Sequence, residues 1–314
     1  MKLKTNLAAD GAILLTTVIW GSTFSVSRGV LDHWPPLTYL ALRMPLAALV
    51  FAALFPRQVF GASRAAWRAG ATLGALIGVG FVGQTAGLLY TTPAKSAFIT
   101  GITTPLVPVV AYAFWRTRPS RENLLGIVLA SIGGALILAP AGAAAFNAGD
   151  LVTLSTTLIF ACHINLMSAY ARRVDARQLS ALQITVAAFV IFAAWLAVRV
   201  VGAVWGAGAL PPGLAREAVA PVWDTGVGFQ IVYLTLVATV ATFLLWTWGQ
   251  ARMPATHAAV IFSLEPVFAT AFAVLLRGSA DWTGPRATLG ALLVLAGVIV
   301  SELRWGREEV VGSQ

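Results

Sequence analysis

The stretch PATHAAVIFSLEPVFATAFAVLL, residues 254–276, contains one charged residue, Glu265, in 23 positions. An apolar run of roughly 20 residues is the length that an α-helix needs to cross about 30 Å of hydrocarbon. The stretch therefore predicts a transmembrane helix that carries a carboxylate beside Pro266. A charged side chain at the centre of a bilayer costs about 2.5–3.5 kcal/mol on insertion scales, so we expect Glu265 to face the helix bundle or a water-filled cavity.

The rest of the chain has the same character. Of its 314 residues, 58% are hydrophobic and only 11% are charged, whereas soluble domains contain about 25% charged residues. The apolar runs are continuous rather than alternating, which favours helices over barrel strands. We expect an all-α membrane protein with ten transmembrane helices, at roughly residues 11–28, 37–55, 70–90, 94–115, 123–140, 151–169, 180–200, 227–248, 254–276 and 285–303.

The net charge of +9 is distributed unevenly over the connecting segments. With ten spans both termini share a side, and that side would hold 14 of the 21 Lys and Arg residues. Cytoplasmic loops of membrane proteins carry such an excess, so both termini are expected to be cytoplasmic. The charge is thus an orientation signal, and no nucleic-acid partner is expected.

Weak self-similarity divides the chain into two halves. Pro93 and Pro105 are separated by 12 positions, as are Pro254 and Pro266. Five spans per half is an odd number, so the second half would enter the membrane from the opposite side, as in secondary transporters. We expect one five-helix repeat at 1–140, a second at 141–305 and a cytoplasmic tail at 306–314. Further matches pair Gly126 and Gly133 with Gly290 and Gly297, and Asp10, Trp20 and Arg43 with Asp150, Phe160 and Gln183.

Four motifs give the chain a family resemblance: WGSTF (20–24), Arg43, GQTAGLLYTTPAKSAFITGITTPLVPVV (83–110) and ATHAAVIFSLEPVFATAFAVLL (255–276). With them the chain resembles the EamA group of ten-span exporters, in the drug/metabolite transporter superfamily. The resemblance implies outward transport of small metabolites such as amino acids, through a central cavity in a bacterial inner membrane. The family's frequent Glu after the fourth and ninth spans is replaced here by WRTRPS (115–120) and RGSADW (277–282).

Polar and aromatic residues inside the spans are the candidate lining of such a cavity. Glu265 either has a functional role, binding a substrate ammonium group or carrying a coupling proton, or it only packs at the kink of Pro266. The corresponding residue of the first half, Thr104, is neutral. The full set of cavity candidates is Trp20, Gln84, Thr100, Thr104, His163, Asn165, Trp246 and Glu265.

Other residues are candidates for helix kinks or gating, for proton coupling and for contacts with headgroups. Pro105, Pro108 and Pro266 lie inside spans, where each removes a backbone hydrogen bond and is expected to kink a helix or act in gating. Histidine is the side chain whose unperturbed pKa lies near neutral pH, so His257 is a second candidate for coupling. Arg43 and Lys95 fall near the outer ends of their spans. Contact with the outer headgroups is expected for both, and a substrate carboxylate is the alternative.

Several chemistries have no motif in the sequence. There is no GxxxxGK[ST], HExxH or GxSxG pattern, and the single cysteine is Cys162. We expect no catalytic residue, metal or cofactor. The expected function is a secondary transporter that exports amino acids or related small metabolites by alternating access, with the small-molecule substrate and the bilayer as partners. An ion gradient, of protons in the favoured case, or the solute gradient itself would drive it, and import is the open alternative to export. An integral membrane enzyme acting on a lipid-linked substrate is the alternative, and both a monomer and a dimer are open.

Overall fold

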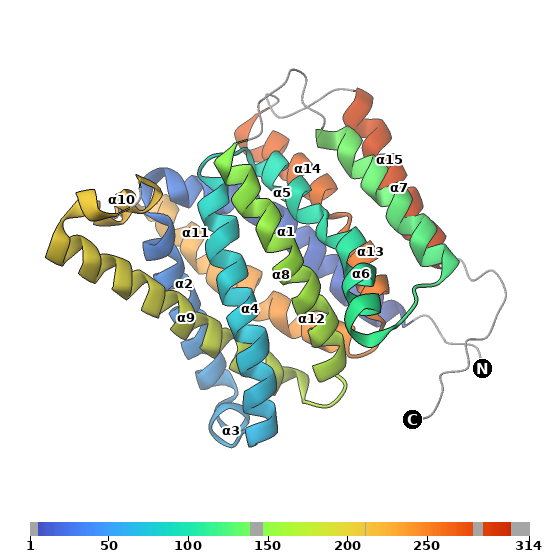
Figure 1. Ribbon diagram of the computed structural model, residues 1–314, viewed down its shortest axis with the longest axis horizontal. Helices are drawn as coiled ribbons and strands as arrows, with labels where there is room; N and C mark the ends of the chain where they lie inside the picture. The colour runs from blue at the N-terminus through green and yellow to red at the C-terminus, as the bar shows by residue number, and fades with distance from the viewer. Residues whose placement is uncertain (1–5, 139–146, 211, 279–284, 303–314) are drawn as a thin grey trace.

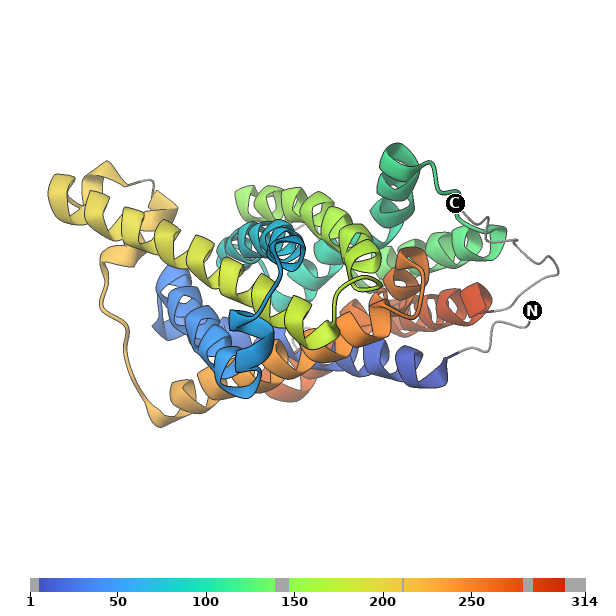
Figure 2. The same ribbon diagram turned by 90° about the horizontal axis from the view of Figure 1, so that it is seen from below.

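The computed structural model describes residues 6–138, 147–210, 212–278 and 285–302. These residues form helices and connections without a strand, which confirms the expected all-helical fold (Figures 1 and 2). The helices are α1 (Leu7–His33), α2 (Pro36–Leu54), α3 (Pro56–Phe60), α4 (Arg64–Leu88), α5 (Pro93–Gly101), α6 (Thr103–Trp115), α7 (Arg121–Leu138), α8 (Ala148–Tyr170), α9 (Ala176–Trp205), η1 (Ala207–Ala209), α10 (Pro212–Ala215), η2 (Arg216–Ala218), α11 (Thr225–Thr235), the π-helical turn η3 (Leu236–Ala241), α12 (Thr242–Gln250), α13 (Ala255–Phe262), α14 (Glu265–Arg277) and α15 (Pro285–Glu302).

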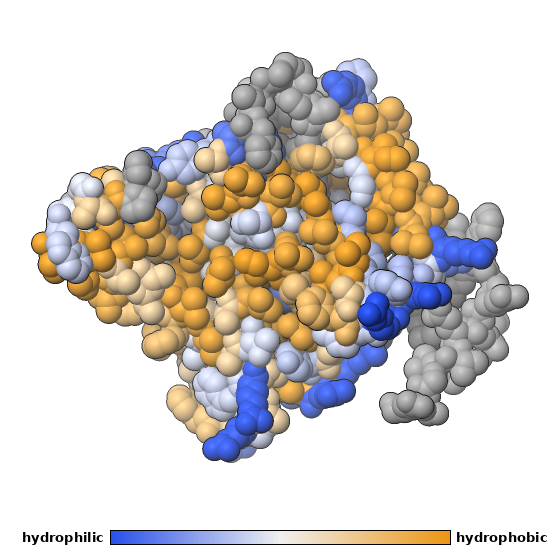
Figure 3. All heavy atoms as spheres, viewed as in Figure 1, coloured by the Kyte–Doolittle hydropathy of each residue, from blue (hydrophilic) through white to orange (hydrophobic). Residues whose placement is uncertain are grey.

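Within the described ranges, eight helical segments are long and apolar enough to cross a membrane. Hydrophobic residues cover much of the visible face, and many of the strongly hydrophilic ones lie along its lower edge (Figure 3). The fifth and tenth expected spans correspond to α7 and α15, and the apolar part of α15 is Thr288–Val300. Ten spans in two inverted repeats therefore remain a prediction. The expected tail, 306–314, lies outside the described residues.

Two of the expected spans are broken helices. The fourth is divided into α5 and α6 at Ile102, and the ninth into α13 and α14 at Ser263 and Leu264. A proline removes the hydrogen bond to the carbonyl four residues earlier and crowds that carbonyl. Each break lies within those four residues, before Pro105 in one span and before Pro266 in the other. Pro108 lies inside α6 without interrupting it.

Glycines set the close approach of α4 to its neighbours. An added Cβ at Gly70 would collide with Leu182 of α9, and one at Gly83 would lie 2.5 Å from Thr156 Cγ2 of α8. Small residues allow membrane helices to approach until their backbones nearly touch. The glycine-rich face of α4 is therefore buried between α8 and α9.

The segment between α9 and α11 is anchored to the start of α2. The Glu217 side chain is fully buried, and its carboxylate accepts hydrogen bonds from the backbone N–H groups of Leu37 and Thr38, at 2.8 and 3.0 Å. Free N–H groups and the helix dipole make a helix N-terminus a favourable place for a carboxylate. Trp34 Nε1 donates to the Val222 carbonyl oxygen at 2.8 Å from the other direction. This segment is fastened to the α1–α2 connection rather than slack.

The helices α7 and α15 form the most extensive helix pair of the described residues (Figures 1 and 2). An added Cβ at Gly133 of α7 would lie 2.5 Å from the Gly290 carbonyl oxygen and 2.7 Å from the Val294 nitrogen, both in α15. An added Cβ at Gly297 of α15 would lie 2.5 Å from the Gly126 carbonyl oxygen in α7. The two glycine pairs seen in the sequence thus face each other across one interface.

We expect Gly133→Ala to separate α7 from α15 and to destabilise the protein by about 1–3 kcal/mol, the usual effect of overpacking. The apparent melting temperature of the purified protein in detergent measures the effect. Gly134→Ala is the matched control, because a Cβ there would make only ordinary contacts at 3.7 Å with Phe98. Equal melting temperatures for the two variants would contradict the close backbone contact at Gly133.

Candidate functional site

A cavity lies among helices that come from both halves of the chain. Its empty volume is about 940 Å³, including the part open to solvent. Binding sites for small molecules are commonly largely apolar hollows with a few polar groups, and this lining has that composition. The lining residues are Trp20, Thr23, Phe24 and Ser27 of α1, Arg43 of α2, Ile77, Phe81, Gln84, Thr85 and Leu88 of α4, Thr100 and Gly101 of α5, Thr103 and Thr104 of α6, Phe160 and Ile164 of α8, Trp246 of α12, Ala259 and Phe262 of α13, and Glu265 of α14.

The cavity is displaced towards one end of the bundle. We call the two ends the Leu7 end and the His33 end, after the first and last residues of α1. On α1 the lining runs from Trp20 to Ser27, and on α4 it reaches Leu88, the last residue of that helix. Nothing on α1 before Trp20 contributes. The hollow therefore extends towards the His33 end.

Glu265 lies in the wall where the two broken helices meet. It is the first residue of α14, and its carboxylate makes no hydrogen bond or ion pair with any described residue. Beside it, Thr104 Oγ1 of α6 donates to the Ala259 carbonyl oxygen of α13 at 3.1 Å. An added Cβ at Gly101 of α5 would lie 3.2 Å from Pro266 Cγ. The structure thus brings Thr104 and Glu265 together in one cavity, next to interrupted helix backbone.

An aromatic cluster closes the cavity towards the Leu7 end. Trp20 stacks on Phe262 with ring centroids 5.5 Å apart and an angle of 19° between the planes, and its ring meets the edge of Trp246 at 4.9 Å. Phe243 lies 5.9 Å from Trp20 and 5.4 Å from Trp246. Offset and edge-to-face pairs at these distances add to the energy of burial. The cluster is a packed floor as well as a surface on which a solute can rest.

Arg43 is the second charged residue of the lining, and it is only 6% exposed. Its Nε donates to the Leu234 carbonyl oxygen and to Thr239 Oγ1, both at 3.1 Å. Its Nη1 donates to the Tyr39 hydroxyl at 2.7 Å. No carboxylate of the described residues forms an ion pair with it. The sequence favoured contact with outer headgroups for Arg43, but the structure directs this guanidinium into the protein.

A π-helical turn, η3, bonds to one side chain from each of two cavity helices. Its Thr239 Oγ1 accepts from Arg43 Nε at 3.1 Å, and its Ala238 carbonyl oxygen accepts from Trp20 Nε1 at 3.3 Å. Thr242 Oγ1 accepts from the same Trp20 nitrogen at 3.1 Å. π-Helical turns are rare and occur frequently at functional sites. Two side chains of the cavity, from α1 and α2, are therefore positioned by one irregular turn.

The structure leaves two of the candidate residues outside the lining. His163 packs behind Trp246 with ring centroids 4.8 Å apart, and its Nε2 bonds to Gln183 Oε1 at 3.0 Å. Asn165 Nδ2 donates to the Val107 and Ala161 carbonyl oxygens at 3.0 and 2.9 Å. Both make the bonds between helices that buried polar groups usually make.

The remaining candidates are distributed over the cavity and a neighbouring hollow. Gln84 and Thr100 line the cavity and bond to each other, with Nε2 to Oγ1 at 3.0 Å. Pro105 and Pro266 line a smaller, mostly apolar hollow beside it, against α7. Pro108 lines neither.

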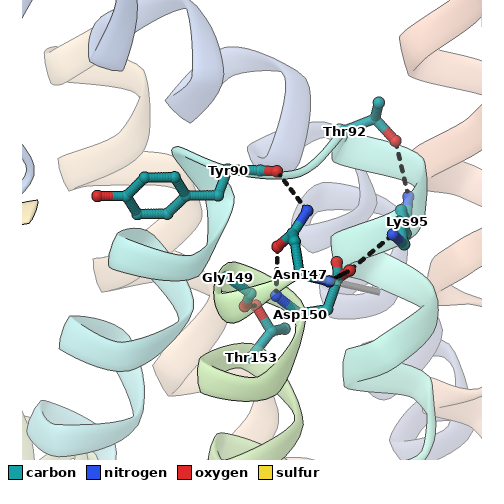
Figure 4. Close-up of polar contacts among 7 residues, drawn as sticks. All are labelled: Tyr90, Thr92, Lys95, Asn147, Gly149, Asp150 and Thr153. Atoms are coloured by element: carbon teal, nitrogen blue, oxygen red, sulfur yellow. Dashed lines mark hydrogen bonds and ion pairs between the residues drawn. The ribbon is translucent and has the colours of Figure 1, made fainter. Parts of the chain in front are cut away.

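Lys95 is bound at the His33 end, away from the cavity lining. Its Nζ lies 2.6 Å from Asp150 Oδ2, and the Asp150 side chain is fully buried (Figure 4). Asp150 forms a capping box with Asn147 at the start of α8. Asn147 Nδ2 also donates to the Tyr90 carbonyl oxygen at 2.9 Å (Figure 4). The Lys95–Asp150 contact links α5 to α8, and the bond from Asn147 to Tyr90 links the start of α8 to the α4–α5 connection.

His257 is bound at the opposite, Leu7 end. Its Nε2 lies 3.0 Å from Asp10 Oδ1, which ties α13 to α1. Nearby, an added Cβ at Gly249 would lie 3.0 Å from the Ile13 side chain. Asp10 and Asp150 are the residues that the sequence matched at an offset of 140 positions. Each therefore bonds to a basic residue in the first turns of a broken helix.

Comparisons with known proteins match transporters over most of the chain. The model of the EamA-like transporter family matches residues 7–139 and 147–303. An uncharacterised transporter of Archaeoglobus fulgidus is 29% identical over 95% of this chain and 87% of its own length. A protein of Escherichia coli, named a probable amino-acid metabolite efflux pump, is 26% identical over 97% of this chain and 99% of its own length. An uncharacterised transporter of Bacillus subtilis is 24% identical over 91% of this chain and 90% of its own length.

A solved structure supports the fold. A crystal structure with 16% sequence identity superposes with a TM-score of 0.68 and covers 93% of this chain and 96% of its own. At this identity the likeness concerns the fold alone. The two family matches together cover most of the 314 residues. The chain is therefore a multi-pass membrane protein that belongs to the EamA-like transporter family.

Proposed function

We propose that the protein is a secondary transporter that exports amino acids or related small metabolites across a bacterial inner membrane by alternating access. The observation that carries the proposal is the cavity, which is lined from both family-matched segments and has Glu265 in its wall. Charged residues within the membrane usually mark a substrate or ion pathway. Interrupted helices beside such a residue are the usual surroundings of a transporter binding site.

The substrate class draws on a relative and on the lining. The relative in Escherichia coli is named a probable amino-acid metabolite efflux pump. An amino acid carries an ammonium group that a carboxylate such as Glu265 can bind, and the aromatic floor suits an apolar side chain. Both features support an amino acid or a close derivative as the exported solute.

Alternating access is supported by two side-chain contacts at opposite ends of the bundle, the Lys95–Asp150 ion pair and the Asp10–His257 hydrogen bond. Lys95–Asp150 holds the His33 end and Asp10–His257 holds the Leu7 end. Each pair joins a residue of the first matched segment to one of the second. In two inverted halves of five spans each, the pairs are equivalent contacts. Opening one while the other stays closed would expose the cavity to one side of the membrane and then to the other.

The direction of the cavity follows from the charges. Exposed arginines cluster near the Leu7 end, among them Arg64, Arg68 and Arg172. The positive-inside rule assigns that end to the cytoplasm. The aromatic floor and the Asp10–His257 pair then close the cytoplasmic side, and the cavity faces outwards. Glu265 and His257 are the titratable groups through which a proton gradient would drive export.

Flux through sealed proteoliposomes tests the proposal. We expect the purified protein to release at least one labelled amino acid from preloaded vesicles, faster than protein-free vesicles do, and we expect a proton gradient to change the rate. Mass spectrometry of the released solute should show an unchanged molecule. If no amino acid crosses, the proposed substrate class is wrong, and a chemically altered product would favour a membrane enzyme.

A further inference from the structure

The guanidinium of Arg43 has unused hydrogen-bonding capacity inside the cavity. Arg carries five N–H donors. Leu234 and Thr239 share the Nε–H group, and Tyr39 accepts one hydrogen of Nη1, which leaves three N–H donors without an acceptor among the described residues. A carboxylate accepts two such donors side by side. The free donors are therefore numerous enough to bind a carboxylate ligand.

The surroundings of Arg43 hold its charge without neutralising it. The guanidinium carbon lies 5.7 Å from the centre of the Phe81 ring and 5.9 Å from that of Tyr39. Ring faces, a hydroxyl and a carbonyl group stabilise a cation, but they do not cancel its charge. Arg43 is 6% exposed and has no anionic partner among the described residues, which is uncommon because a buried charge is normally paired. The missing anion is what a bound solute can supply.

Three neighbours fix the position of this cation. Thr239 Oγ1 of the π-helical turn accepts from Arg43 and also donates to the Leu234 carbonyl oxygen of α11 at 2.8 Å. Tyr39 lies one helical turn before Arg43 on α2, and its hydroxyl lies 3.1 Å from Ser27 Oγ of the cavity wall. The guanidinium is thus held in position before a ligand binds, which reduces the entropy lost on binding.

We propose that Arg43 is the carboxylate-binding residue of the cavity, held in place by Tyr39 and by Thr239 of the π-helical turn. The inference rests on the proposed transport function for its setting, and it adds a residue that selects for solutes bearing a carboxylate. Arg43 would bind the carboxylate of a solute whose ammonium group is bound by Glu265.

Binding to the purified full-length protein tests this assignment. Trp20 and Trp246 line the cavity, so their fluorescence reports occupancy. The probes are amino acids, each paired with its methyl ester, which keeps the ammonium group and the side chain but lacks the carboxylate. We expect the parent protein to bind at least one acid roughly 10- to 100-fold more tightly than its ester, the range for a hydrogen bond to a charged group.

The variants separate recognition from folding. In Arg43→Gln the preference for acid over ester is expected to disappear, whereas Arg43→Lys should keep part of it, because the charge remains without the paired donors. Thr239→Val should weaken acid binding while leaving ester binding unchanged. Arg28→Gln is the control, since Arg28 also donates to backbone carbonyl groups, at Leu88 and Leu89, but pairs with Asp32 and lies outside the lining. Melting temperatures identify any variant that fails to fold.

Each outcome bears on one claim. Equal binding of acid and ester by the parent, no binding of any acid, or a preference that survives in Arg43→Gln would overturn the assignment. Acid binding that depends on Arg43, with no flux in proteoliposomes, would overturn the transport proposal and leave the assignment intact. Flux of the esters as fast as that of the acids would overturn the assignment of Arg43 and leave the transport proposal intact.

Discussion

Glu265→Gln is expected to reduce transport in proteoliposomes at least about tenfold, which corresponds to about 1.4 kcal/mol. The substitution keeps the size of the side chain and removes its charge and its proton. Since the Glu265 carboxylate has no partner among the described residues, the change should leave folding intact while removing the proposed ammonium ligand and proton carrier. Transport by the parent should vary between pH 5 and pH 8, and transport by the variant should not.

Two further variants control this experiment. Glu265→Asp keeps the charge and should retain part of the activity. Glu122→Gln removes a carboxylate at the start of α7, outside the cavity lining, and should transport as the parent does. Equal rates for Glu265→Gln and the parent across the pH range would remove Glu265 from both proposed roles and leave it as a packing residue beside Pro266.

Lys95→Met is expected to destabilise the protein by about 3–5 kcal/mol, the usual effect of removing one partner of a buried ion pair. Asp150 is fully buried, and its Oδ1 has no hydrogen-bond donor among the described residues (Figure 4). Without Lys95, its charge would keep the backbone donor of Asn147, at 2.9 Å, among the described residues. The melting temperature in detergent should fall clearly.

The double variant Lys95→Met/Asp150→Asn separates charge from packing. An asparagine can still accept a hydrogen bond from the Asn147 backbone, so most of the lost stability should return. Arg252→Met is the matched control, because Arg252 is exposed and bonds only locally, to the Trp248 carbonyl oxygen. A double variant as unstable as Lys95→Met would show that the ion pair is not what stabilises this end of the bundle.

The fold was predictable because the solvent leaves few options. Long apolar runs can satisfy their backbone groups in lipid only as helices, and the runs were visible directly. The breaks in two spans followed from Pro105 and Pro266, whose effect on a helix is local. The glycine pairs of α7 and α15 were visible in the sequence as a repeat, but their facing one another depends on tertiary packing that no local pattern encodes.

The site was only partly predictable. Glu265 stood out because a charge in the membrane needs an explanation, and the same rule applied to Arg43. The position of Arg43 near the outer end of its expected span favoured a contact with the headgroups. The sequence did not show that α11 and η3 would supply its hydrogen-bond partners. The π-helical turn LVATVA contains no proline or glycine from which an irregular helix could be predicted. His163 and Asn165 were sensible candidates, but their positions relative to the cavity depended on helix rotation.

The glycine contacts between α7 and α15 join the last helices of the two family-matched segments. Each matched segment finishes with a helix whose complementary surface belongs to the other segment. A polypeptide cut between residues 138 and 147 would yield two fragments, each with an unmated helical edge exposed to lipid. Neither fragment could bury this helix surface alone, so the two fragments would have to associate in the bilayer before either reached its native structure.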